Sequence, residues 1–457
     1  MASSDSSGAL EHNALGLVQS TVIGVAGTAP AYSIAATTAA LIGSVGLLAP
    51  ASLLYCGLIM LGITLAYVNL NRIEADAGAT YAWVSLIFND TLGFFSGWTV
   101  LVASALFMVS ATLPAASATV LLLAPDQIDN RLLVTLVALG WLMMVSVVLI
   151  RGIAITGVVQ TTMTTIELGV LAIVGGTAAW KFGPAALHQL TWASFSLIQF
   201  DLSTFARGAV ISLFFFWGWD VVLNLNEETR DGTRTPGLGA ICAMIIIMVS
   251  FVGFCSVALS ALSDEEISQS STNVIFAIAD KLFPRPWSYL AIVAVMLSTI
   301  GTLETSILQF SRTLFSKSRA QVMHRRWSQL HPSWKTPWAG TLLIAVLGGL
   351  LLVLSLLFDS LDAVLKASIQ AISVQAAYYY GIAGFACAWH YRHALTQSVS
   401  RSLFAVIWPA ASALVLWSAA IVNLQDVDGV TGVIAVGGIL LGALPLGLLR
   451  WRQRAAG

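Results

Sequence analysis

The amino-acid sequence predicts an all-α integral membrane protein with twelve transmembrane helices. Of its 457 residues, 58% are hydrophobic and only 9% are charged, whereas soluble proteins carry about a quarter charged residues. The mean hydropathy is +0.86. Long apolar intervals separate the charged residues, and each is close to the roughly 20 residues that a helix needs to cross a bilayer core. The intervals show no alternation of apolar and polar residues, which excludes a β-barrel.

The charge-free intervals locate the transmembrane helices along the chain. The first covers residues 13–71 and holds two spans separated by a turn that contains glycine and proline. Three further spans each contain one acid in an otherwise apolar run, at Glu167, Asp220 and Glu304. The remaining spans correspond to intervals 91–125, 132–150, 235–263, 336–358, 367–391, 402–425 and 429–449.

The basic residues are distributed unevenly between the two sides of the predicted bundle. If both termini lie on one side, fifteen of the 21 lysines and arginines fall on that side. The positive-inside rule therefore predicts a plasma-membrane protein with both termini in the cytoplasm, where residues 1–13 and 451–457 form short tails. The first apolar stretch is too long for a signal peptide, so we expect it to be retained.

Composition and motifs exclude several function classes. A net charge of −1 provides no basic field for nucleic acid. The sequence has no His-x-x-x-His or Gly-x-Ser-x-Gly motif, and its histidines fall at predicted helix ends or in loops. Its four cysteines lie in apolar stretches, without the spacing of a zinc site or a disulfide framework. We therefore expect a protein that is not an enzyme and holds neither metal nor cofactor.

Two predicted spans contain residues that interrupt a helix at mid-membrane. The first span holds Gly24, Gly27 and Pro30, and the sixth holds Gly218 within residues 214–220. Backbone groups freed at this depth must face protein or a water-filled cavity, because lipid offers them no hydrogen bonds. Such breaks are typical of binding sites, although a simple kink is the alternative for either break alone.

The positions of these breaks predict how the spans are arranged. The second break lies five spans after the first, so the broken helices run in opposite directions, which is the signature of an inverted repeat. We expect one repeat of five spans in residues 14–182 and a second in residues 205–392. Residues 402–450 hold the last two spans.

Several motifs resemble those of the amino acid–polyamine–organocation (APC) superfamily of secondary transporters, and specifically its amino acid permeases. The resemblance covers nearly the whole chain and implies a core of five plus five helices with two peripheral C-terminal helices. Residues 74–81 are similar to a Pro-x-x-Gly-Gly-x-Tyr motif, with Ala77 in place of one glycine. The other matching segments are residues 214–220 and 227–236 at the sixth span, and residues 311–315 and 331–337 after the eighth.

The resemblance also implies where an amino acid substrate binds. In such transporters, backbone N–H groups at the break in span one hold the substrate carboxylate, and carbonyl groups at the break in span six hold its amine. The N-terminus of a half-helix is indeed a site that favours anions. Close packing of small and aromatic residues is the alternative for this segment. The candidate residues are Ala26, Gly27, Thr28, Phe214, Phe215, Phe216, Trp217 and Gly218, with Phe214 at the position of an aromatic gate.

Glu167 is the main candidate for coupling transport to an ion. It shares a helix face with Gln160 and Thr164, and an ionised carboxylate at mid-membrane costs about 2.5–3.5 kcal/mol. Some relatives place a lysine at the aligned position, where its charge fills the role of a bound sodium ion. An acid here implies a site for a proton or another cation. A structural hydrogen bond from neutral Glu167 is the alternative.

The eighth span carries a polar stripe. Ser298 and Thr302, with Thr305 and Gln309, repeat at helical spacing on one face. The resemblance implies that hydroxyl groups here complete a cation site beside span one, and hydrogen bonding between helices is the alternative.

Three further ionisable residues lie in the predicted spans or at their ends. Asp220 matches an acidic position that relatives use in pH-dependent gating. Glu304 points away from the polar stripe, and we expect it to form a structural pair. Lys366 is expected to pair with Asp362, which lies four residues earlier.

We therefore predict a secondary active transporter of amino acids that works by alternating access, either coupled to protons or as an exchanger. A carrier of polyamines or other organic amines is an alternative, and it would need acids along its cavity. A sodium-coupled symporter and a substrate sensor that does not transport are further alternatives.

Overall fold

The computed structural model of the protein describes residues 9–270, 273–358, 361–426 and 429–456. Within these residues the fold is all-helical apart from one isolated β-bridge, between Leu15 and Thr229. Nine regions of the described chain are long and apolar enough to cross a membrane. The predicted class, an all-helical membrane protein, is therefore confirmed.

The first half of the chain forms seven helices. Asparagine caps begin two of them: the Asn89 side chain accepts a hydrogen bond from the Leu92 N–H at 2.9 Å, and Asn130 accepts one from the Leu133 N–H at 3.2 Å. The helices are α1 (Leu17–Gly27), α2 (Pro30–Val45), α3 (Ala49–Ile73), α4 (Thr80–Ile87), α5 (Asp90–Leu123), α6 (Arg131–Ile150) and α7 (Ile153–Phe182).

The second half begins with α8, which the Asp201 side chain caps by accepting from the Thr204 N–H at 2.6 Å. Short 3₁₀ turns connect many of the helices. The helices are α8 (Leu202–Phe215), α9 (Val221–Asn224), α10 (Thr235–Ala261), α11 (Asp264–Ser270), α12 (Val274–Leu282), α13 (Leu290–Arg319), α14 (Trp338–Leu354), α15 (Leu361–His390), α16 (Val399–Ser402), α17 (Trp408–Asp426), α18 (Gly429–Leu440) and α19 (Ala443–Ala456).

The chain is interrupted at both predicted positions. Between α1 and α2, Ala29 adopts a left-handed conformation with φ of 47°, and Pro30 begins α2 at the first helical position, where its missing N–H costs nothing. Between α8 and α9 the backbone turns at Gly218, whose φ of 103° favours glycine. Each break leaves a short stretch of non-helical backbone inside the bundle.

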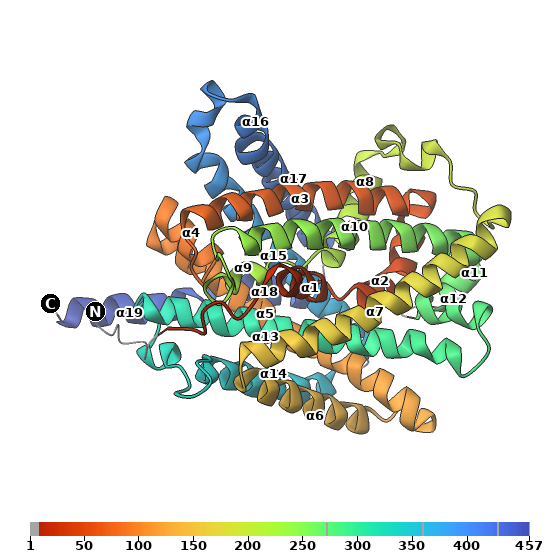
Figure 1. Cartoon of the computed structure of the whole chain (residues 1–457), viewed down its shortest axis with the longest axis horizontal. Coiled ribbons are helices and arrows are strands. Elements are labelled where there is room, and N and C mark those ends of the chain that lie inside the picture. The colour runs from red at the N-terminus through yellow and green to blue at the C-terminus, as the bar shows by residue number, and fades with distance from the viewer. Residues whose placement is uncertain (1–8, 271–272, 359–360, 427–428, 457) are drawn as a thin grey trace.

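The long helices run side by side along the molecule, with both termini at the same end (Figure 1). In that view α3 and α10 lie on one side, α6 and α14 lie on the other, and α13 passes between them. In the most apolar part of Trp287–Arg319, which contains α13, 72% of residues are buried, compared with 22% for Gly429–Trp451. The helix α13 is therefore a central element against which both breaks can pack.

Candidate functional site

The two breaks contact each other through their backbones. A Cβ atom placed on Gly27 would overlap the carbonyl group of Gly218, and a Cβ atom on Gly218 would overlap the carbonyl group of Gly27. Glycine is therefore required at both positions by this close approach, and at Gly218 also by its positive φ. In this conformation the Cβ side of Gly27 faces the second break.

The first turn of α2 offers backbone N–H groups that have no partner within the helix. The Ala31 N–H donates to Oε1 of Glu167 at 2.9 Å, and the Tyr32 N–H donates to the hydroxyl of Ser298 at 3.2 Å. Glu167 and Ser298 are each about 1% exposed. The positive end of α2 is thus occupied by a carboxyl group of the protein itself.

Thr302 extends this contact to the break. Its hydroxyl donates to the Gly27 carbonyl at 2.8 Å, so the polar stripe of α13 reaches the interrupted segment. The N–H groups of Thr28 and Ala29 donate to the carbonyls of Val25 and Ala26, at 3.1 and 3.0 Å. The structure therefore brings Ser298, Thr302 and Glu167 together around the start of α2.

Asp220 anchors the second break. Its carboxylate accepts hydrogen bonds from the Tyr380 hydroxyl at 2.6 Å and from Nε2 of Gln309 at 2.7 Å. Tyr380 also accepts from the Gly218 N–H at 3.3 Å, and the Trp217 indole donates to the Tyr379 hydroxyl at 2.7 Å. Sequence reasoning missed both tyrosines, although three consecutive tyrosines in an apolar span were a visible signal.

The aromatic residues before the break point in different directions. The ring of Phe214 meets that of Tyr32 edge-on, with centroids 6.5 Å apart. Phe215 and Phe216 instead both pack against Phe251 on α10, with centroid distances of 5.0 and 5.3 Å. Residues 214–218, which were predicted to bind substrate, therefore do not all face the same space.

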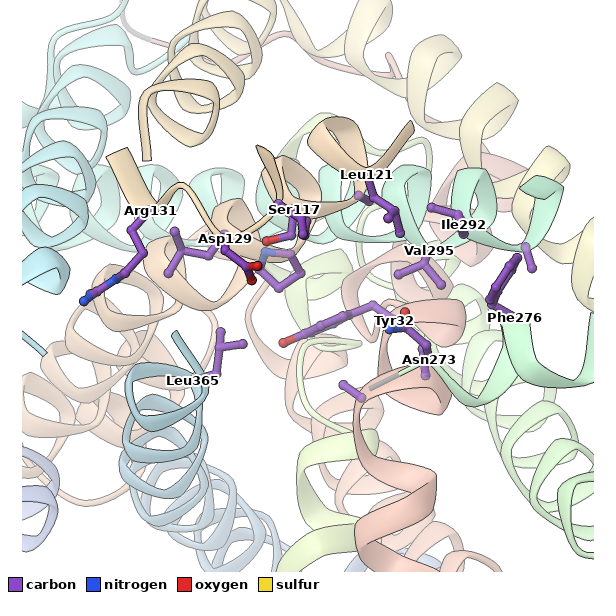
Figure 2. Close-up of a pocket in the computed structure, with 17 residues that line it drawn as sticks. Tyr32, Ser117, Leu121, Asp129, Arg131, Asn273, Phe276, Ile292, Val295 and Leu365 are labelled. Atoms are coloured by element: carbon purple, nitrogen blue, oxygen red, sulfur yellow. The ribbon is translucent and has the colours of Figure 1, made fainter. Parts of the chain in front are cut away.

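A cavity of about 540 Å³ lies beside Tyr32 (Figure 2). Residues at the start of α13 line it, and this helix begins at the end of the bundle opposite to both termini (Figure 1). The cavity walls come from α2, the end of α5, the start of α13 and residues 128–131. Figure 2 shows the Tyr32 ring extended across the middle of this space. Asp129 and Arg131 are the charged side chains that line it in the described part of the chain. None of the residues predicted to bind substrate lines the cavity. Phe214 packs against Tyr32, which does line it.

Near the termini, ion pairs join the motif segments of different helices. The guanidinium of Arg312 donates to both carboxylate oxygens of Glu228 at 2.9 Å, and the two side chains are 1% and 0% exposed. Nearer the surface, Arg319 pairs with Asp76 at 2.7 Å and with Glu227 at 2.6 Å. The segments around residues 76, 227 and 312, which carry the resemblance stated above, therefore meet in space.

The N-terminal segment packs against the residues around Glu228. The N–H groups of Ala14 and Leu15 donate to the Glu228 carbonyl at 2.9 and 3.1 Å, and the Arg230 N–H donates to the Leu15 carbonyl at 2.9 Å. Leu10 is 2% exposed in a small apolar cluster with residues 77 and 315. Residues 10–13 belong to the predicted tail; of these, Leu10 is buried against the bundle, and His12 and Asn13 are exposed.

Glu304 and Lys366 have different environments. Glu304 is 2% exposed and faces α7; when the Gln160 amide is oriented to satisfy both of its ends, its nitrogen lies 3.2 Å from Oε2 of Glu304. Lys366 is exposed, and its expected partner, Asp362, has a side chain that lies outside the described residues.

Comparison with known proteins identifies the family. The profile described as amino acid permease matches residues 13–444. The serine/threonine exchanger SteT of Bacillus subtilis is 22% identical over 61% of this chain and 61% of its own length. The low-affinity putrescine importer PlaP of Escherichia coli is 23% identical over 68% of this chain and 67% of its own length. The Asc-type amino acid transporter 1 of Homo sapiens is 25% identical over 65% of this chain and 56% of its own length.

These matches confirm the resemblance inferred from residues 74–81, 214–236 and 311–337. The chain spans only about three fifths of the length of SteT and of the human transporter. The family profile, in contrast, covers all the helices that carry the two breaks and their partners. The chain therefore belongs to the amino acid permease family.

Proposed function

We propose that the protein is a secondary active transporter that carries amino acids across the plasma membrane by alternating access. The observation that carries this proposal is the direct contact between two interrupted helices, Gly27 to Gly218, at the centre of the bundle. The exchanger, importer and transporter names of the relatives support it. The cavity at one end of the bundle and the ion pairs at the other make the two ends different, as alternating access requires.

We further infer twelve spans in two inverted repeats. Span one is α1 with α2, and span six is α8 with α9. The nine candidate regions become twelve because Leu17–Ile73 holds two spans, and because α8 and α15 are counted in addition. The spans α17 and α18 are then the peripheral pair.

Orientation can be tested by labelling. If both termini are cytoplasmic, the cavity opens to the outside and residues 319–338 form a cytoplasmic loop. In a background without native cysteines, a cysteine at Asp129 should react with an impermeant maleimide added to intact cells, and a cysteine at Gln329 should not. Both positions are exposed in the structure. External labelling at Gln329 would contradict the orientation, and labelling of both after permeabilisation is the control.

In the proposed recognition mode, the break between α1 and α2 binds the substrate carboxylate and the break between α8 and α9 binds its ammonium group. The N-terminus of α2 contributes about half a positive charge, and backbone carbonyls near residues 215–218 are acceptors for an amine. The same geometry supports proton coupling at Glu167 as part of this proposal. The carboxyl group of Glu167 accepts the hydrogen bond from the Ala31 N–H. A negative charge on Glu167 therefore competes with a substrate carboxylate for the N-terminus of α2.

A competition assay tests this mode. In liposomes that contain the purified protein, unlabelled amino acids should inhibit uptake of a labelled amino acid mixture at least tenfold more strongly than the corresponding decarboxylated amines. Amines lack the carboxylate that the first break would bind. Equal inhibition by amines would contradict the proposal.

The same assay also addresses a second candidate function, transport of polyamines. The likeness to the putrescine importer favours it. However, Asp129 is the single acid that lines the cavity within the described residues, and Arg131 lies in the same wall. Putrescine uptake that amino acids do not inhibit would favour this second candidate.

A further inference from the structure

The cavity beside Tyr32 contains a buried polar group that no described residue satisfies. Tyr32 is 3% exposed, and its hydroxyl group is buried without a hydrogen-bond partner among the described residues. Contacts elsewhere position this residue, because its backbone N–H donates to the Ser298 hydroxyl at 3.2 Å and its ring meets that of Phe214 edge-on. Since a buried hydroxyl group normally has a partner, the Tyr32 hydroxyl is free to bind a molecule that enters the cavity.

Two side chains of opposite charge line the same cavity without pairing with each other. Asp129 and Arg131 lie at the beginning of α6, and none of the ion pairs in the described part of the chain joins them. The Asp129 carboxylate has no hydrogen bond to any residue that the structure describes. Nη2 of Arg131 donates to the Ser355 carbonyl at 3.0 Å, but its Nε is buried and has no partner within the same residues. An acid and a base that line one space without pairing can each bind one charge of a ligand.

The charged and the apolar side chains lie on different sides of the cavity. In Figure 2 the hydroxyl end of Tyr32 points toward the side where Asp129 and Arg131 lie, and Ile292 and Val295 lie on the other side. The volume of about 540 Å³ falls within the range of about 300–1,000 Å³ that is usual for small-molecule sites. Such sites are mostly apolar, with a few polar groups that orient the ligand. This cavity therefore fits a small molecule with a charged end and an apolar end.

We propose that this cavity is an outer binding site for an amino acid in its zwitterionic form. Asp129 pairs with the ammonium group, Arg131 pairs with the carboxylate, and the Tyr32 hydroxyl donates to the same carboxylate. Hydrogen bonds between such charged groups are stronger than neutral ones, and a guanidinium suits a carboxylate because it offers several N–H donors in one plane. The apolar wall contacts the side chain of the ligand.

This outer site is separate from the one proposed at the two helix breaks. Residues 26–28 and 214–218 do not line the cavity, and Phe214 touches Tyr32, which does. An amino acid that enters from the cavity end therefore meets the outer site before it reaches the breaks. This inference rests on the proposed transport of amino acids, and it adds a second place on the protein where the same substrate binds.

Protection of a cysteine in the cavity wall measures whether the outer site is occupied. Ser117 lines the cavity and is partly exposed, so a Ser117→Cys substitution in a protein without native cysteines reports on this space. The protein is reconstituted in liposomes and treated in the cold with a small impermeant thiol reagent, with and without a mixture of amino acids. We expect the mixture to slow the modification severalfold, and the concentration that gives half of this protection measures the apparent affinity.

Two substitutions in the same background test the polar contacts. Asp129→Asn removes a charged contact, so half-protection should need about tenfold more amino acid. Tyr32→Phe removes a single hydroxyl group, and the concentration should rise about three- to tenfold. A structural role of this hydroxyl predicts no change, because it has no partner among the described residues. Asp126→Asn is the matched control and should leave protection unchanged, since Asp126 is an exposed acid in the same loop that does not line the cavity.

Ligand analogues test the requirement for both charges. Decarboxylated amines lack the carboxylate and N-acetylated amino acids lack the ammonium group, so each should protect about tenfold less well than amino acids. Equal protection by amines would overturn the zwitterionic ligand and the role of Arg131. If amino acids give no protection, or if protection is unchanged in both Asp129→Asn and Tyr32→Phe, the outer site is wrong. Amino acid uptake in the same liposomes would then leave the proposed function standing, whereas absence of any uptake would contradict that function itself.

Discussion

Replacement of Glu167 by glutamine is expected to abolish accumulation of amino acids driven by an inward proton gradient, while exchange continues. The amide oxygen of glutamine can still accept the Ala31 N–H, which Glu167 now accepts at 2.9 Å, so α2 keeps its contact with α7. Glutamine cannot bind or release a proton, and therefore the gradient has no group through which to act. Accumulation should fall to the level reached without a gradient, and exchange should remain within severalfold of wild type.

The assay is uptake by proteoliposomes at two values of the pH gradient. Glu265→Gln is a matched control, because Glu265 is an exposed acid on α11 outside the proposed machinery, and it should accumulate substrate as wild type does. Proton-driven accumulation that persists in Glu167→Gln would remove Glu167 from the mechanism. A requirement for sodium in the wild type would favour the sodium-coupled alternative.

The second large effect is expected at the buried ion pair between Glu228 and Arg312. Both side chains are almost fully buried, and two hydrogen bonds of 2.9 Å join them. Glu228→Gln leaves the guanidinium charge in place without its counter-charge, and such a change typically costs about 3–5 kcal/mol. Glu227→Gln, at the partly exposed pair with Arg319, should cost no more than about 1 kcal/mol.

Thermal unfolding in detergent measures this difference. The melting temperature should fall by several degrees more in Glu228→Gln than in Glu227→Gln, which serves as the matched control. A double variant with Arg312→Met should be more stable than Glu228→Gln alone, because it removes the uncompensated charge. Equal melting temperatures for the two single variants would contradict the assignment of a buried, desolvated pair.

The fold class and the two breaks could be predicted from sequence because their causes are local. A run of apolar residues must be helical in lipid, whatever its neighbours are. Gly27, Pro30 and Gly218 interrupt a helix through their own backbone preferences. That Ser298 and Thr302 share one face follows in the same way from helical spacing, and in the structure both hydroxyl groups hydrogen-bond to backbone groups beside the first break.

The partners of these groups could not be predicted, because they depend on how distant helices pack. Glu167 contacts a residue 136 positions away, and Tyr380 contacts one 160 positions away. Lys317 is one of the fifteen lysines and arginines that the sequence analysis assigned to the side of the termini, where it was expected in a cytoplasmic loop. The structure instead buries it in the last turn of α13, where its amine donates to the Phe94 carbonyl at 2.7 Å and lies 3.7 Å from the Phe94 ring centroid.

The sequence by itself determined that this protein is helical and lies in a membrane, that two of its helices are broken, and which family it resembles. Hydropathy and backbone preference act within a few residues, so they can be read directly along the chain. Only the tertiary structure decided that the N-terminus of α2 is held by Glu167, that Gly27 faces Gly218, and that Arg312 forms a buried ion pair with Glu228. The reason is physical: a buried polar group must find a partner, but which of many candidate groups becomes that partner is decided by the packing of whole helices.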